Sequence, residues 1–133
     1  NSNPVISWEG APEGTVAFAL IFDDPTAGNF PHWAIWDIPG DATGLNAGIS
    51  GAEVSNNLPS GAFELQNGGG FVGYLGSCPG PNSVNQYSWR LYALDTALGG
   101  DFGTYAQLES AAQAAELDMV EMCHVFDGDN SPF

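Results

Sequence analysis

The densest group of chemically capable residues in the sequence lies between two apolar segments. Asp23 and Asp24 follow the apolar run 15–22, and His32 opens the aromatic run 32–38. Asp24 can accept a hydrogen bond from a ring nitrogen of His32 and so orient the imidazole, because strands that follow one another along a chain tend to be neighbours. If it does, we expect the pKa of His32 to lie above about 6.5, whereas burial without a charged partner would lower it. The alternative is a turn acid and a core imidazole that belong to no site.

A second group lies in a turn that is rich in glycine and proline. Tyr74 precedes this turn, whose members are Gly76, Ser77, Cys78 and Pro79. Backbone N–H groups of such a turn can hold an anion without a cation, and the alternative is a plain tight turn. Tyr87, at the start of the next strand, would bring a hydroxyl group to the same rim.

Other chemistry has weaker support in the sequence. A hydrolase would use His32 or His124, but neither adjoins a G-x-S-x-G nucleophile elbow, so we expect no catalytic residue. Cys78 and Cys123 allow one disulfide, with buried free thiols as the alternative. The chain has only two His and two Cys, which is poor material for a zinc site, and we predict no metal and no cofactor.

The elements that position these residues are mostly strands. Short apolar or aromatic runs bounded by Gly, Pro and Asp predict strands at 15–22, 32–38, 71–75 and 85–95. In the last of these, Tyr87, Trp89 and Leu91 share one face, and Ser88, Arg90 and Tyr92 share the other. The region 41–70 is rich in Gly, Ala, Asn and Ser, which predicts a long loop with one short helical turn and one short strand.

One helix is predicted near the end of the chain. Thr104 and Gln107 have the spacing of a capping box, which marks the start of a helix. Apolar residues at helical spacing extend the predicted helix to about Met122; they are Leu108, Ala111, Ala112, Ala115, Met119 and Met122. Residues 124–126 would form a last short strand. Strands followed by a late helix favour a β-rich domain with a peripheral helix.

The charge balance excludes several classes of protein. The 133 residues include 16 acids and a single base, Arg90, for a net charge of −15. A basic nucleic-acid patch, a polybasic membrane anchor and a P-loop with its Lys are therefore excluded. No apolar run approaches the ~20 residues of a membrane-spanning helix, so we expect no integral membrane association. Cytoplasmic and secreted or periplasmic locations stay open, as do a monomer and a homodimer.

Motifs in order along almost the whole chain resemble the phosphatidylethanolamine-binding protein family, in its bacterial and archaeal Raf-kinase-inhibitor-like branch. FPHWAIWDIP at 30–39 is similar to the family pattern F-x-H-W-x-x-x-x-I-P, and YSWRLYALD at 87–95 is similar to Y-x-F-x-L-Y-A-L-D. The further matching segments are 3–8, 9–28, 74–79 and the late helix that ends at 123–125, which resembles the family's final helix before G-H-V-L.

The resemblance implies a mainly β fold. This fold is a sandwich of two antiparallel sheets with one or two peripheral helices, the main one near the C-terminus. Residues 1–133 would form a single domain of this kind, possessing less chain at its N-terminus than the family usually has. The resemblance also implies a small anion pocket at one end of the sheets, since the family binds phosphate-type anions and phospholipid head groups. The ligand-binding residues are then expected to be Asp24, His32, Tyr87, Gly76, Ser77, Cys78, Pro79, Phe30, Tyr74 and Asn85.

The chain departs from the family pattern at the expected pocket. Asn85 and Gln86 stand where the motif G-x-H-R-Y has its histidine and arginine, and they offer amide donors without charge. A net charge of −15 also repels an anion. We therefore expect a non-enzymatic protein with a small anionic or zwitterionic ligand. The alternatives are an inhibitor that contacts a protease or kinase through the 41–70 loop or the C-terminal tail, and a small hydrolase.

Overall fold

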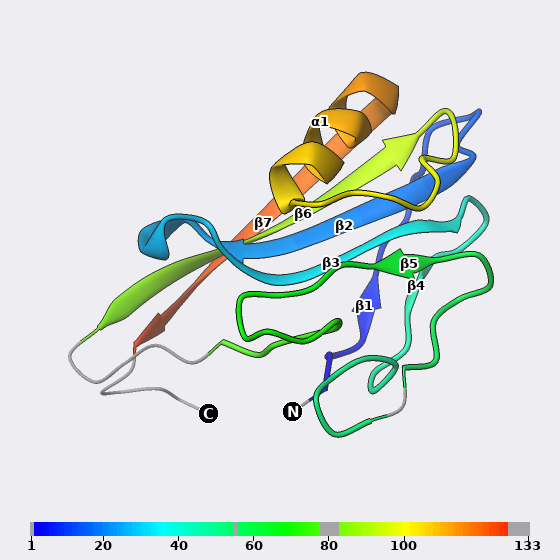
Figure 1. The fold of residues 1–133 in the computed structure, drawn as a ribbon. Coiled ribbons are helices and arrows are strands. Elements are labelled where there is room, and N and C mark those ends of the chain that lie inside the picture. Colours follow the sequence, from blue (N-terminus) through cyan, green and yellow to red (C-terminus); the bar gives the residue numbers. More distant parts are fainter. Residues whose placement is uncertain (1, 55, 78–82, 128–133) are drawn as a thin grey trace.

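The structure, a computed structural model, describes residues 2–54, 56–77 and 83–127. Figure 1 shows a twisted sheet with one helix on one face and a smaller strand layer with long loops on the other. The elements in chain order are β1 (Ile6–Ser7), β2 (Ala17–Asp24), the 3-10 turn η1 (Pro25–Ala27), β3 (Phe30–Pro39), β4 (Gly44–Leu45), β5 (Phe63–Glu64), β6 (Val84–Leu94), α1 (Tyr105–Ala115) and β7 (Glu116–Asp127).

The strands form two antiparallel sheets, which confirms the predicted fold class. The larger sheet has the order β5-β3-β2-β6-β7, and the smaller one pairs β1 with β4. The single α-helix of the described residues, α1, lies near the C-terminus, as expected. Within the described ranges, no helix is both long and apolar enough to cross a bilayer.

Strand β2 is the centre of the sheet, and all eight of its residues are buried. Because side chains alternate across a strand, Phe18, Leu20 and Phe22 face the β1–β4 layer, where they join an aromatic core. Ala17, Ala19 and Ile21 face α1 and join a second core with Leu108 and Ala112. Burial on both faces explains why the sequence of this strand is continuously apolar.

The predicted helix is correct at its start and wrong after Ala115. Thr104 Oγ1 accepts a hydrogen bond from Gln107 N at 3.1 Å, as the capping pattern predicts. Residues after Ala115 form β7, which pairs antiparallel with β6 from Leu94↔Glu116 to Val84↔Asp127. Long-range pairing with β6 outweighs the helix propensity of Leu, Met and Glu in this segment. Residues 123–125 therefore lie in a strand and not at the end of a helix, and the predicted short strand at 124–126 is part of β7.

The other predicted elements are confirmed in part. Strands β2, β3 and β6 fall on the three long predicted runs. The predicted strand 71–75 is wrong, because Gly73 has a positive φ of 137° and Tyr74 N donates to Ser50 Oγ instead of to a neighbouring strand. The 41–70 loop contains two strands of two residues each, β4 and β5.

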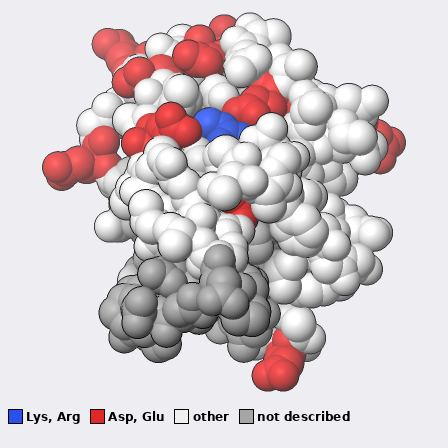
Figure 2. All heavy atoms as spheres, turned by 90° about the vertical axis from the view of Figure 1, so that its left-hand side faces the viewer, with Lys and Arg blue, Asp and Glu red and all other residues white. Residues whose placement is uncertain are grey.

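The single cation of the chain connects three elements on the helix side of the sheet. Arg90 on β6 forms two hydrogen bonds with Asp23 on β2, at 2.9 and 2.8 Å, and two with Glu109 on α1, at 2.6 and 3.0 Å. Tyr92 also donates to Glu109 at 2.6 Å. Figure 2 shows the blue guanidinium enclosed by red carboxylates. The positive charge is thus neutralised within the fold.

Candidate functional site

The turn between β2 and β3 positions the first group of candidate residues. Asp24 ends β2 and caps η1, since its Oδ1 accepts from Ala27 N at 3.2 Å. Gly28 and Asn29 then take left-handed conformations, with φ of 68° and 62°. This reversal brings Phe30 opposite Asp24 in the β2–β3 pair, so that β3 carries its residues back along the same end of the sheet.

His32 is buried among aromatic rings, with 5% of its surface exposed. Its ring centroid lies 4.9 Å from Phe22, 5.2 Å from Phe30 and 5.3 Å from Tyr87. Nδ1 lies 2.9 Å from the carbonyl oxygen of Leu75, which can only accept, so Nδ1 carries the proton. In the neutral imidazole, Nε2 is then the acceptor nitrogen.

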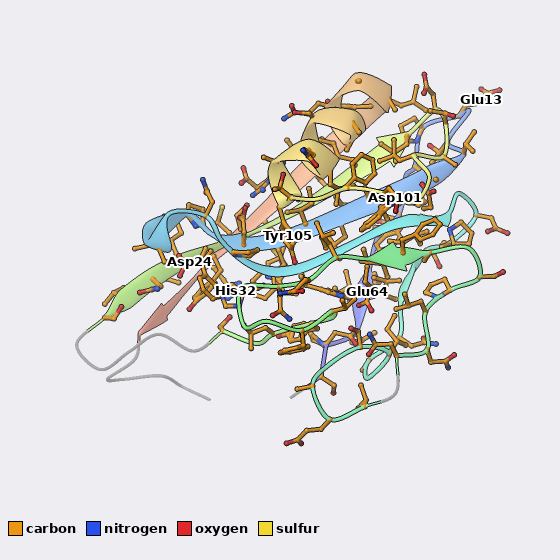
Figure 3. All side chains as sticks on the ribbon, in the orientation of Figure 1. Glu13, Asp24, His32, Glu64, Asp101 and Tyr105 are labelled. Atoms are coloured by element: carbon orange, nitrogen blue, oxygen red, sulfur yellow. The ribbon has the colours of Figure 1, made fainter. Side chains whose placement is uncertain are left out.

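The predicted hydrogen bond between His32 and Asp24 is wrong. Both residues lie at the same end of the sheet (Figure 3), but the described hydrogen bonds of Asp24 go to Ala27 N and to Asn85 Nδ2, the latter at 2.6 Å. The Leu75 carbonyl therefore orients the imidazole. Burial lowers the pKa of His32, and this effect outweighs the hydrogen bond to Leu75 and the charge of Asp24, which raise it. The expected raised pKa is thus wrong as well.

Strand β6 brings two further candidates to this end of the sheet. Asn85 donates to Asp24 and accepts a short hydrogen bond from Ser83 Oγ. Asn85 therefore holds the Asp24 carboxylate in place. Tyr87 is almost completely buried, and its ring packs edge-on against His32.

His124 lies in the same cluster, although the sequence predicted only a short strand there. It is opposite Tyr87 in the β6–β7 pair, and the two rings stack with centroids 5.0 Å apart. Its Nδ1 accepts from Trp89 Nε1 at 3.3 Å, so Nε2 carries the proton and lies 3.4 Å from Ser77 Oγ. Burial, followed by the charge of nearby His32, lowers the pKa of His124. The sequence carries no clear signal for this position, because Glu121 is the single charged residue among the mostly apolar residues 119–125.

The remaining candidates lie around the cluster or outside the described residues. Tyr74 is buried against Phe22 at 5.9 Å, and burial raises the pKa of its hydroxyl group. Gly76 and Ser77 follow Leu75, while Cys78 and Pro79 lie outside the described residues. Cys123 lies exposed on β7. Because Cys78 is outside the described residues, the disulfide between the two stays a prediction.

We call the group of His32, Tyr87 and His124 the His–Tyr cluster. It combines an acceptor nitrogen on His32 with a ring N–H donor on His124, and both imidazoles pack against one phenol ring. Asp24 adds a fixed carboxylate at the same end of the sheet. Over residues 2–54, 56–77 and 83–127, no three His, Cys, Asp or Glu side chains gather in a way that would hold a metal ion.

The two-sheet fold and the His–Tyr cluster define a class of β proteins. Comparison with known proteins identifies the family to which the chain belongs. A model of the phosphatidylethanolamine-binding protein family matches residues 1–126, so the chain belongs to this family. A UPF0098 protein of Methanothermobacter thermautotrophicus is 42% identical over 118 residues, which are 87% of this chain and 74% of that protein.

Escherichia coli YbcL is similar in both sequence and structure. It is 34% identical over 100 residues, which are 72% of this chain and 54% of that protein, so the chain spans about half the length of this relative. Its crystal structure, described as a new member of the mammalian PEBP family, superposes with a TM-score of 0.84 and 28% identity. The match covers 96% of this chain and 80% of the YbcL chain.

Proposed function

We propose that the His–Tyr cluster binds a small ligand with a phosphate-type anionic or zwitterionic head group, and that the protein is not an enzyme. Membership of the phosphatidylethanolamine-binding protein family supports a ligand of this class. The Raf-kinase-inhibitor-like branch and a protease or kinase as partner stay predictions.

The observation that carries this proposal is the pair of opposite tautomers in the cluster. The Leu75 carbonyl fixes the proton of His32 on Nδ1, and the Trp89 indole fixes the proton of His124 on Nε2. One imidazole thus offers an acceptor and the other a donor. A protonated phosphate, with a P–OH group and acceptor oxygens, complements such a pair. An ammonium group of a zwitterion would be attracted by Asp24.

The tautomers also argue against the hydrolase alternative. A general base must accept the proton of its nucleophile, as in a Ser–His pair. Ser77 Oγ lies 3.4 Å from His124 Nε2, but this nitrogen already carries a proton while Nδ1 accepts from Trp89. His124 therefore cannot activate Ser77 in this arrangement.

The test is a ligand titration followed at the two imidazoles. Inorganic phosphate, phosphoethanolamine and glycerophosphocholine are added separately, and the ring nitrogens are observed by long-range nitrogen–proton NMR. We expect saturable shifts at His32, and a loss of phosphate affinity of roughly tenfold in His32→Gln, which corresponds to one ordinary charged hydrogen bond.

The control for this titration is Gln107→Ala, a substitution of an exposed residue on α1 that leaves the cluster intact. It should bind like the unmodified protein. If no ligand shifts the His32 nitrogens at any concentration, the proposed pocket is wrong. Turnover of phosphate or ester substrates that disappears in His32→Gln would show that the protein is an enzyme instead.

A further inference from the structure

A cavity of about 460 Å³ lies on the face of the sheet opposite α1, next to the His–Tyr cluster. One wall is the N-terminal segment 4–8, which includes β1, and the other wall is formed by β2, β6 and β7. Figure 1 shows β1 and α1 on opposite sides of the larger sheet. The volume falls within the roughly 300–1,000 Å³ of small-molecule sites.

The lining of this cavity is apolar and carries no positive charge. Leu91 on β6 and Val120 and Met122 on β7 point into it, and Val120 and Met122 are 58% and 63% exposed. Glu121 contributes to the lining, but its carboxylate accepts a hydrogen bond at 2.6 Å from Ser88, whose hydroxyl group accepts from Arg90 on the α1 side of the sheet. Arg90 is engaged on the α1 side of the sheet. Alkyl or aromatic groups therefore suit the cavity, whereas an anion does not.

The cavity adjoins the candidate polar site, and His124 belongs to both. Trp89 and His124 line the cavity, and the hydrogen bond between them also fixes the tautomer of His124 in the cluster. Trp89 stacks on Phe22 at 3.9 Å, and Phe22 in turn packs against His32. A row of contacting rings thus leads from the cavity to the cluster.

We propose that this cavity holds the uncharged alkyl or aryl part of an amphiphile whose polar end lies at the His–Tyr cluster. This inference rests on the proposed function for the polar end, but the cavity itself can be tested separately. The absence of cationic side chains from the lining and the net charge of −15 select against an acidic apolar part.

The experiment uses two fluorescent probes that differ by one negative charge. N-phenylnaphthylamine is uncharged, and anilinonaphthalene sulfonate is its anionic analogue. We expect the uncharged probe to bind at least roughly tenfold more tightly, because the sulfonate meets no cation in the lining and is repelled by the acidic protein. Val120→Glu should abolish this binding. Val125→Glu is the matched control, since Val125 lies on the same strand, is 65% exposed and does not line the cavity.

A second experiment tests whether the cavity and the polar site bind the two ends of one ligand. Hexyl phosphate, a monoester that has a P–OH group when singly ionised, should displace the uncharged probe and also shift the His32 nitrogens, whereas phosphoethanolamine should shift His32 without displacing the probe. Failure of the uncharged probe to bind while phosphoethanolamine still shifts His32 overturns the cavity proposal alone. Probe binding without any response of His32 overturns the proposed function and, with it, the amphiphile.

Two further outcomes overturn the cavity proposal. Equal binding to the Val120→Glu and Val125→Glu variants places the probe elsewhere on the surface. Sedimentation that shows a dimer, with probe binding only after dilution to monomers, assigns this face to a second copy of the chain.

Discussion

At the scale of single residues, the two imidazoles determine how stability responds to mild acid. Burial lowers the pKa of His32 and of His124 below 6.5 in the folded protein. At pH values between the folded and the unfolded pKa, the unfolded chain binds more protons than the folded protein does. The free energy of unfolding therefore falls as the pH drops below about 6.5. Each pKa unit of difference corresponds to about 1.4 kcal/mol.

We therefore expect His32→Gln to flatten the decrease in the free energy of unfolding between about pH 7 and pH 5. His124→Gln, at a more exposed site, should flatten it less. Urea denaturation at several pH values measures both slopes. A variant with the same pH dependence as the unmodified protein would show that His32 titrates normally.

Arg90 is the residue whose loss should cost most stability on the helix side of the sheet. Its partner Asp23 is only 5% exposed, so removal of the guanidinium leaves a buried carboxylate without compensation. We expect Arg90→Met to lower the free energy of unfolding by about 3 kcal/mol in urea denaturation. The double variant with Asp23→Asn should recover part of this loss, because the unpaired charge is then removed.

Glu109 depends on the same cation. Burial raises the pKa of Glu109, but the hydrogen bonds from Arg90 and Tyr92 and the charge of Arg90 outweigh burial and lower it below 4.5. Its contribution to stability is thus present above pH 4.5 and is lost as the pH falls through the folded pKa. In Arg90→Met, the decrease in the free energy of unfolding below pH 4.5 should be smaller than in the unmodified protein. This pH window is distinct from that of the histidines.

At the scale of elements, β7 is a strand in a segment that the sequence pattern assigned to a helix. In an antiparallel edge strand only every second amide is bonded to the neighbouring strand. We expect amide hydrogen exchange along 117–125 to alternate between slow and fast, since β6 is the one strand that pairs with β7 among the described parts of the chain. Uniform protection over this segment would indicate a helix.

The strands show which part of this fold can be predicted from the sequence. β2, β3 and β6 are buried runs with strong local patterns, and they were predicted close to their bounds. β7 was not, because Met and Leu fit both periods and its strand state comes from pairing with β6.

The candidate site, like the fold, can be predicted from the sequence only in part. Asp24 and His32 lie at the same end of the sheet because β2 and β3 are consecutive strands, which chain order predicts. Tyr87 joins them because β6 pairs with β2, which chain order does not predict. The partners of His32 and His124, the Leu75 carbonyl and the Trp89 indole, depend on side-chain packing between distant segments, which no local pattern contains.

At the scale of the whole molecule, the charge of −15 should act on anionic ligands at a distance. Salt shortens the Debye length from ~30 Å at 0.01 M to ~8 Å at 0.15 M and so weakens the repulsion. We expect the ratio of phosphate affinity to glycerophosphocholine affinity to rise with salt, in calorimetric titrations at both concentrations. The neutral zwitterion corrects for competition by the salt anion. A falling ratio would indicate a locally positive site.

The placement of Arg90 between Asp23 and Glu109 has a practical consequence. Trypsin cleaves after Lys or Arg, and this chain offers it one peptide bond, which follows a residue clamped between two strands and a helix. The native protein should resist the protease, and each unfolded molecule should yield two fragments from a single cut. The rate of trypsin cleavage, followed on a gel, therefore measures global unfolding without any added label.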